Sequence, residues 1–143
     1  MLLECTESQL VLVDYQSLLM PAIFDGPGVL ANAVRLATMA QLHAVPVWAS
    51  AQNPDKLGPF MQPLQAVLDA AGVKVMPKMH FSAAAEGLGE ALRPPARKVG
   101  GNARSLPKHL QKPAVAEAEG RSTLVIAGCE AHICLMQTAL DLL

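Results

Sequence analysis

The segment Gln9-Leu10-Val11-Leu12-Val13-Asp14 decides the fold class, because an apolar run ends here in a carboxylate. Similar short runs occur at residues 45–49, 73–76 and 123–127. Continuous apolar runs of this length are typical of strands that are covered on both faces, as they are in a parallel sheet. The sequence therefore predicts parallel strands at these positions.

Apolar residues at helical spacing occupy the two longer stretches between the first three runs. One stretch carries Val29, Ala33, Leu36, Ala37 and Ala40, and the other carries Leu64, Val67, Leu68 and Ala71. Strands that alternate with helices indicate a three-layer α/β/α fold with a parallel, Rossmann-like sheet. In such sheets ligands bind beyond the carboxyl ends of the strands, so polar residues at those ends are the first candidates for chemistry.

The composition excludes several classes of protein. No run of about 18 apolar residues is present, so we expect no membrane span. A formal net charge of −1 and an aromatic content of 3% do not fit a nucleic-acid-binding domain. With 143 residues and three cysteines, we expect one domain, residues 1–143, that keeps its thiols free. No signal-peptide pattern precedes Asp14, so we expect a cytoplasmic protein.

Residues 94–120 interrupt the alternation of strands and helices. This stretch is rich in proline and carries five basic residues, Arg97, Lys98, Arg104, Lys108 and Lys112. Loops of this length are uncommon in compact domains, so we expect a surface insertion. It can be a mobile insertion or a basic flap that attracts an acidic substrate, and both interpretations stay open.

Cys134 is a candidate nucleophile. It follows the predicted strand at 123–127 and lies near the start of a predicted helix over 135–143. At a helix start, unpaired backbone N–H groups and the helix dipole favour the thiolate, which is the reactive form of cysteine. A cysteine in an apolar segment can also be a buried structural residue, so the partners of Cys134 decide between the two interpretations.

Asp14 and Lys78 are candidate partners at the ends of two other predicted strands. A carboxylate directly after a buried strand needs a compensating partner, although Asp often serves as a helix N-cap. Pro77 is expected to end the third strand because it lacks an N–H donor, so that Lys78 leaves the sheet at the edge where Asp14 lies. Asp14 can then act as a general base, while Lys78 keeps it ionised and places positive charge near a developing oxyanion.

Three segments carry a family resemblance: Val11-Leu12-Val13-Asp14-Tyr15-Gln16, Lys78-Met79-His80-Phe81-Ser82 and Gly128-Cys129-Glu130-Ala131-His132-Ile133-Cys134. In order and spacing they resemble the signature segments of isochorismatase-like cysteine hydrolases. Residues 52–54, 57–59 and 137–143 look closest to the isochorismatase domain-containing subgroup. The resemblance implies a hydrolase that acts on a small amide or related carbonyl substrate through a covalent thioester, without a cofactor.

The resemblance also implies a role for each site residue. Asp14, Lys78 and Cys134 would form a catalytic triad in which Cys134 carries the thioester. A cis peptide bond is implied between Cys129 and Glu130, and the backbone amides of Glu130 and Cys134 would form the oxyanion hole. Five further side chains are expected in the pocket wall: Tyr15, Gln52, His80, Phe81 and His132.

The sequence departs from the family pattern in two ways, which concern the metal site and the length of the domain. The segment Trp48-Ala49-Ser50-Ala51-Gln52-Asn53 lacks the Asp-x-His ligands by which the nicotinamidase branch binds a metal. His80 and His132 are isolated in the sequence, so we expect no metal site. The family domain normally continues for further strand–helix units, whereas this chain ends one helix after Cys134, so we expect a domain truncated at its C-terminus.

Such a truncation has a consequence for partners besides the small-molecule substrate. The strand at 123–127 would become an uncharged sheet edge and the final helix would lose cover. We therefore expect either a homo-oligomer or a fragment of a longer protein that supplies the missing strands. Two alternatives stay open: a non-catalytic binding or assembly subunit of the same fold, and a Rossmann-type nucleotide binder. The nucleotide binder is disfavoured because Asp14-Tyr15-Gln16, and not Gly-x-Gly-x-x-Gly, follows the first strand.

Overall fold

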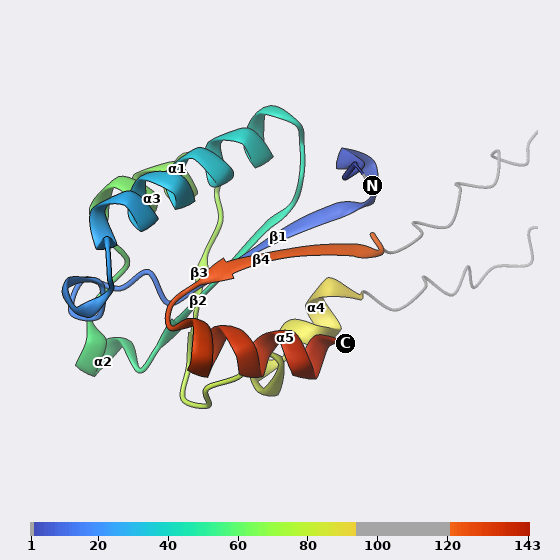
Figure 1. Cartoon of the computed structure of the whole chain (residues 1–143). Helices are drawn as coiled ribbons and strands as arrows, with labels where there is room; N and C mark the ends of the chain where they lie inside the picture. Colours follow the sequence, from blue (N-terminus) through green and yellow to red (C-terminus); the bar gives the residue numbers. More distant parts are fainter. Residues whose placement is uncertain (1, 94–120) are drawn as a thin grey trace, which may run out of the picture.

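The computed structural model describes residues 2–93 and 121–143, and the expected insertion at 94–120 lies outside these residues. Four parallel strands form one sheet in the order β3-β2-β1-β4. They are β1 (Ser8–Val13), β2 (Val47–Gln52), β3 (Val75–Lys78) and β4 (Thr123–Gly128). Helices lie on both faces of the sheet (Figure 1). This arrangement confirms the predicted α/β class.

Each face of the sheet has its own helices and its own apolar cluster. Helices α1 (Gly26–Leu42) and α3 (Gln62–Ala70) cover one face, and α4 (Leu88–Leu92) and α5 (Met136–Leu142) cover the other (Figure 1). The remaining short elements lie in connections: the 3-10 turns η1 (Cys5–Glu7), η2 (Met20–Ala22) and η3 (Ala83–Glu86), the helix α2 (Pro54–Leu57) and the π-helical turn η6 (Ala131–Leu135).

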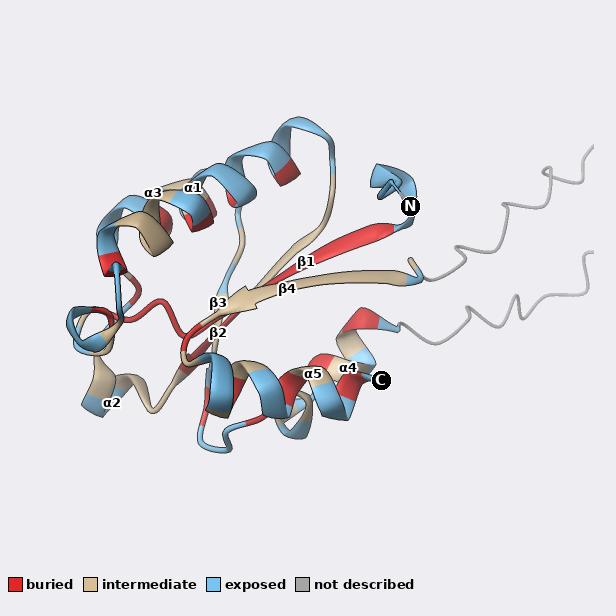
Figure 2. Ribbon diagram, viewed as in Figure 1, coloured by how far each residue is buried: buried red, intermediate tan, exposed pale blue. Residues whose placement is uncertain are grey.

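The central strand β1 shows why a parallel sheet needs cover on both faces. All six of its residues are buried (Figure 2). Leu10 and Leu12 point into the cluster under α1 and α3, while Val11 and Val13 point into the cluster under α4 and α5. The alternation of side chains along a strand therefore supplies one apolar set to each layer.

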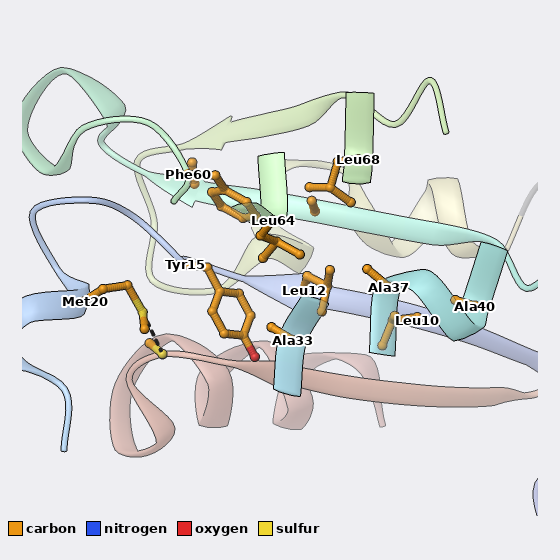
Figure 3. Close-up of a cluster of buried hydrophobic side chains, with 13 residues drawn as sticks. Leu10, Leu12, Tyr15, Met20, Ala33, Ala37, Ala40, Phe60, Leu64 and Leu68 are labelled. Carbon is orange, nitrogen blue, oxygen red and sulfur yellow. Dashed lines mark hydrogen bonds between the residues drawn. The ribbon is translucent and has the colours of Figure 1, made fainter. Parts of the chain in front are cut away.

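A capping residue fixes the start of helix α1, and small residues let it pack on the sheet. The Asp25 side chain accepts a hydrogen bond from the Gly28 amide at the helix start, which satisfies one of the free N–H groups there. Of the residues predicted for the apolar face of α1, Ala33, Ala37 and Ala40 are buried (Figure 3). Leu36 was predicted with them but is exposed. The small side chains of the three alanines let the helix backbone lie close to the sheet.

Strands β2 and β3 both extend further toward their carboxyl ends than the apolar runs predicted. The expectation that Pro77 ends the third strand is wrong, because β3 includes Pro77 and Lys78. The Lys78 carbonyl accepts a hydrogen bond from the Asn53 amide, so the backbone of Pro77 faces away from β2. Proline is tolerated there because β3 is an edge strand of the described sheet, where none of the described strands needs the missing N–H donor.

Strand β4 lies at the other edge of the described sheet, as predicted. Its six residues are half-buried, in contrast to β1 (Figure 2). Gly128, its last residue, lies so close to β1 that a Cβ atom there would collide with the carbonyl oxygen of Val13. Within the described ranges no helix is long and apolar enough to cross a membrane. A cytoplasmic location stays a prediction.

Candidate active site

Asp14 is the first residue after β1 and is completely buried. Its backbone adopts a left-handed conformation, with φ of 59°, which Asp tolerates better than most residues. Two neighbours hold the carboxylate. Oδ1 accepts a hydrogen bond from the backbone amide of Gln52 at 3.0 Å, and Oδ2 accepts one from Lys78 Nζ at 2.8 Å. A buried carboxylate in this position is thus compensated by an ion pair and a backbone donor.

Lys78, the last residue of β3, has a relative exposure of 1%. Besides Asp14, its ammonium donates to Gln52 Oε1 at 2.8 Å and to the Phe81 carbonyl at 3.0 Å, and a longer contact of 3.4 Å reaches the His80 carbonyl. A lysine ammonium has three N–H donors, so these partners occupy all of them. Lys78 can therefore support Asp14 electrostatically, and its ammonium is surrounded by acceptors.

Cys134 lies in η6 and is also buried. Its thiol interacts with both Asp14 and Lys78. Burial, followed by the hydrogen bond and charge of Asp14, raises the pKa of Cys134 to about 11, and Lys78 opposes this shift. The three candidate side chains, which are remote in the sequence, are thus brought together.

The protonation state of Cys134 corrects the interpretation made from the sequence. A thiolate was expected because of a helix start, but Cys134 lies inside a π-helical turn, and α5 begins two residues later. Desolvation and the neighbouring carboxylate both disfavour the thiolate. A thiol beside a base is therefore the resting form. Burial raises the pKa of Asp14, whereas the contacts with Lys78 and Cys134 lower it.

The segment before Cys134 connects β4 to the site. The peptide bond between Cys129 and Glu130 is cis. The Cys129 amide donates to the Val13 carbonyl at 2.9 Å, and its sulfur lies 3.8 Å from that of Met20 in the core. Burial, together with the charges of Asp14 and Glu130, raises the pKa of Cys129 to about 11. Cys129 is therefore a buried structural thiol on the opposite face from Cys134.

The expected pocket-wall residues fall into different places. Tyr15 lies in the core, where it is 3% exposed and packs edge-to-face on Phe60 (Figure 3). Gln52 is part of the hydrogen-bond network around Lys78. The side chain of Phe81 is exposed, and its carbonyl contacts Lys78.

The two histidines are exposed, and each lies near a glutamate. His80 Nδ1 is 2.8 Å from Glu86 Oε1, and His132 Nε2 is 3.5 Å from Glu130 Oε2. Among the residues that the structure describes, no group of three or more His, Cys, Asp or Glu side chains could hold a metal ion.

Gln16 is a site residue that the sequence analysis did not single out. It is completely buried. Its Oε1 accepts a hydrogen bond from the backbone amide of Gln52 at 2.8 Å. Its Nε2 donates to the backbone carbonyls of Gln52 at 2.9 Å and Gly58 at 2.8 Å. The side-chain amide thus makes the hydrogen bonds to the Gln52 backbone that a neighbouring strand would make. These bonds keep Gln52 next to Asp14. Its signal in the sequence was a large polar residue in the segment that follows a buried strand.

The chain was compared with known proteins. No family model matches it. It is 32% identical to mouse isochorismatase domain-containing protein 2A over 139 residues, which are 95% of this chain and 52% of the relative. It is 31% identical to zebrafish isochorismatase domain-containing protein 1 over 131 residues, 91% of this chain and 37% of the relative. The chain thus spans about half the length, or less, of these relatives.

Solved structures with the same fold cover nearly the whole chain. A structure described as MAR1 ribonuclease from Caenorhabditis elegans has a TM-score of 0.75 at 22% identity, over 98% of this chain and 59% of that one. The YcaC gene product from Escherichia coli, described as an octameric hydrolase of unknown specificity, has a TM-score of 0.73 at 19% identity, over 98% and 58%. YcaC from Pseudomonas aeruginosa, described with covalent acrylamide, has a TM-score of 0.72 at 18% identity, over 98% and 59%.

Proposed function

Because this chain belongs to the isochorismatase-like family, we propose that it is a cysteine-dependent hydrolase of a small amide or related carbonyl compound. The observation that carries the proposal is the buried Asp14–Lys78 ion pair that interacts with the thiol of Cys134. A cation, a carboxylate and a thiol in one buried cluster are the groups that covalent catalysis at a carbonyl needs.

The first half of the reaction makes a thioester. As the sulfur of Cys134 attacks the substrate carbonyl carbon, its proton passes to Asp14, so no free thiolate has to accumulate against the raised pKa of the thiol. The backbone amides of Glu130 and Cys134 are the proposed donors to the tetrahedral oxyanion. When that intermediate collapses, Asp14 returns the proton to the leaving nitrogen, and an amine or ammonia departs.

The second half releases the acid. Asp14 takes a proton from a water molecule, which attacks the thioester carbon, and the collapse of this second intermediate returns the proton to the sulfur of Cys134. Lys78 keeps Asp14 ionised between these steps, because its charge opposes the effect of burial on the pKa of the carboxyl. Lys78 acts through its ion pair with Asp14 and through its charge beside Cys134.

The Pseudomonas neighbour offers further support. Acrylamide, which is covalently bound in that protein, is an electrophile of the kind that cysteine sulfur attacks. A reactive nucleophile on the same fold fits a hydrolase better than the alternative of a non-catalytic binding subunit.

The test is a screen of small neutral amides and esters with the purified protein. We expect turnover with at least one compound and an acyl adduct on Cys134 in the mass spectrum, both lost in Cys134→Ala. Asp14→Asn tests the base separately from the nucleophile, and we expect it to abolish hydrolysis. The pH at which Cys134 becomes alkylated should fall by about one unit in this variant, because Asp14 raises the pKa of the thiol. Activity that persists in Cys134→Ala would refute the proposal.

We also propose that the chain self-associates through β4 and α5. The half-buried strand β4 has an open edge in the described sheet. Leu124 and Ile126 of this strand line a hollow of about 510 Å³ together with Ala139, Leu142 and Leu143. Arg93 and Arg121 also line this hollow. A strand edge without charges is a template for another chain. The octameric state described for Escherichia coli YcaC fits such an assembly.

A further inference from the structure

Glu86, the last residue of η3, holds the segment that follows β3. Its Oε1 accepts from the Met79 amide at 2.9 Å, from the His80 amide at 3.3 Å, and lies 2.8 Å from His80 Nδ1. These contacts keep the pKa of Glu86 low, at about 2, mainly through the two backbone amides and the His80 side chain. Glu86 is therefore a carboxylate at neutral pH, and it anchors one side of the segment at residues 79–81.

The other side of the same segment faces the site. Its carbonyls accept hydrogen bonds from the two inner side chains of the network: Phe81 and His80 from Lys78 Nζ at 3.0 and 3.4 Å, and Met79 from Gln52 Nε2 at 3.1 Å. The peptide groups of residues 79–81 thus lie between Glu86 outside and Lys78 inside. A movement of this segment would change the acceptors around the ammonium directly.

We propose that Glu86 is a positioning residue, which fixes residues 79–81 so that their carbonyls aim the Lys78 ammonium at Asp14 and Cys134. This inference rests on the proposed function, because it assigns Glu86 to the same site. Glu86 is partly exposed, so its pairing with His80 contributes little stability by itself. Its effect is geometric: two of the ammonium's carbonyl acceptors belong to the segment that it anchors.

The direction of the effect follows from the charges around Lys78. The titratable groups that face the ammonium are Asp14 from β1 and Cys134 from η6, and the group that faces Glu86 is His80. Lys78 opposes the rise in the pKa of Cys134. If residues 79–81 are released, the ammonium loses its fixed position and stabilises the thiolate less. Ionisation of Cys134 should then require a higher pH.

The experiment measures the rate at which iodoacetamide alkylates Cys134 as a function of pH, read by mass spectrometry of the peptide. We expect Glu86→Ala to move the midpoint up by about half a pH unit, which is about a three-fold lower rate at a fixed pH below the midpoint. Glu86→Gln keeps an oxygen acceptor for both amides and should restore the wild-type profile. Glu90→Ala removes an exposed glutamate of α4 and serves as the matched control, with no shift expected.

An alkylation profile of Glu86→Ala that coincides with the wild type would overturn the inference. If Glu86→Ala does not fold, Glu86→Asp replaces it: the charge remains, but the side chain is too short to reach both amides, so the same upward shift is expected and its absence is equally decisive. Alkylation needs no substrate. A failed substrate screen would therefore refute the proposed function and leave the profile readable, whereas an unchanged profile in an active enzyme would refute only the role of Glu86.

Discussion

The carboxyl ends of β1 and β3 and the open edge of β4 lie on the same sheet, yet they are stabilised differently. At the carboxyl ends, Asp14, Gln16 and Lys78 are buried, and each makes at least two hydrogen bonds. Along β4 the side chains are apolar and only half-buried. Buried polar groups need partners, whereas apolar groups only need cover. The first region is therefore sensitive to the loss of a single partner, and the second to what lies against it.

Removing the cation at the carboxyl ends should have the largest effect. Lys78→Met leaves the Asp14 carboxylate buried without its cation, with the Gln52 backbone amide and the Cys134 thiol as remaining donors. Breaking a buried ion pair on one side costs about 3–5 kcal/mol. We expect a loss of that size in the free energy of unfolding, measured by urea titration at pH 7. The double variant Asp14→Asn/Lys78→Met should lose less than Lys78→Met alone, because no charge is then left unpaired. A loss below about 1 kcal/mol in Lys78→Met would contradict the buried pairing.

Gln16 should have the next largest effect. Gln16→Leu fills a similar volume but leaves the carbonyls of Gln52 and Gly58 without this donor, which costs about 1–3 kcal/mol. The matched control is Gln41→Leu, because Gln41 donates to the Val67 carbonyl from an exposed position. That control should change stability by no more than about 0.5 kcal/mol. Equal losses in both variants would show that burial of the network is unimportant.

The smallest expected effect concerns association through the β4 edge. Leu124→Lys places a charge in the hollow beside α5. Leu124 also packs against the buried cluster under α4 and α5, so the folding of the variant is checked first by urea titration. If copies associate there, light scattering should give an apparent dissociation constant about tenfold weaker, or about 1.4 kcal/mol. Leu42→Lys, at the exposed end of α1 on the other layer, should leave association unchanged. A wild-type protein that stays monomeric at high concentration would remove the basis for this prediction.

Local patterns in the sequence were sufficient for the class of fold and for the identity of three interacting side chains. The run at residues 10–13 is apolar throughout because both faces of β1 are covered, and an apolar run of that kind is visible without coordinates. Asp14, Lys78 and Cys134 could be selected because parallel strands end at one edge of a sheet. The spacing of Ala33, Ala37 and Ala40 likewise revealed the buried face of α1.

The tertiary structure alone decided how those residues are held. Gln16 and Glu86 contact partners tens of residues away or across a turn, so neither propensity nor periodicity could reveal their contacts. Gln52 was named from the family resemblance, but its hydrogen bond with Lys78 appears only in the fold. The same is true of the thiol form of Cys134, because desolvation and a neighbouring charge depend on what the fold places around the sulfur and not on the residues beside it in the chain. The periodic spacing of apolar residues is a local property of the sequence. The pairing of buried polar groups, in contrast, forms only when strands that are distant in the sequence come together.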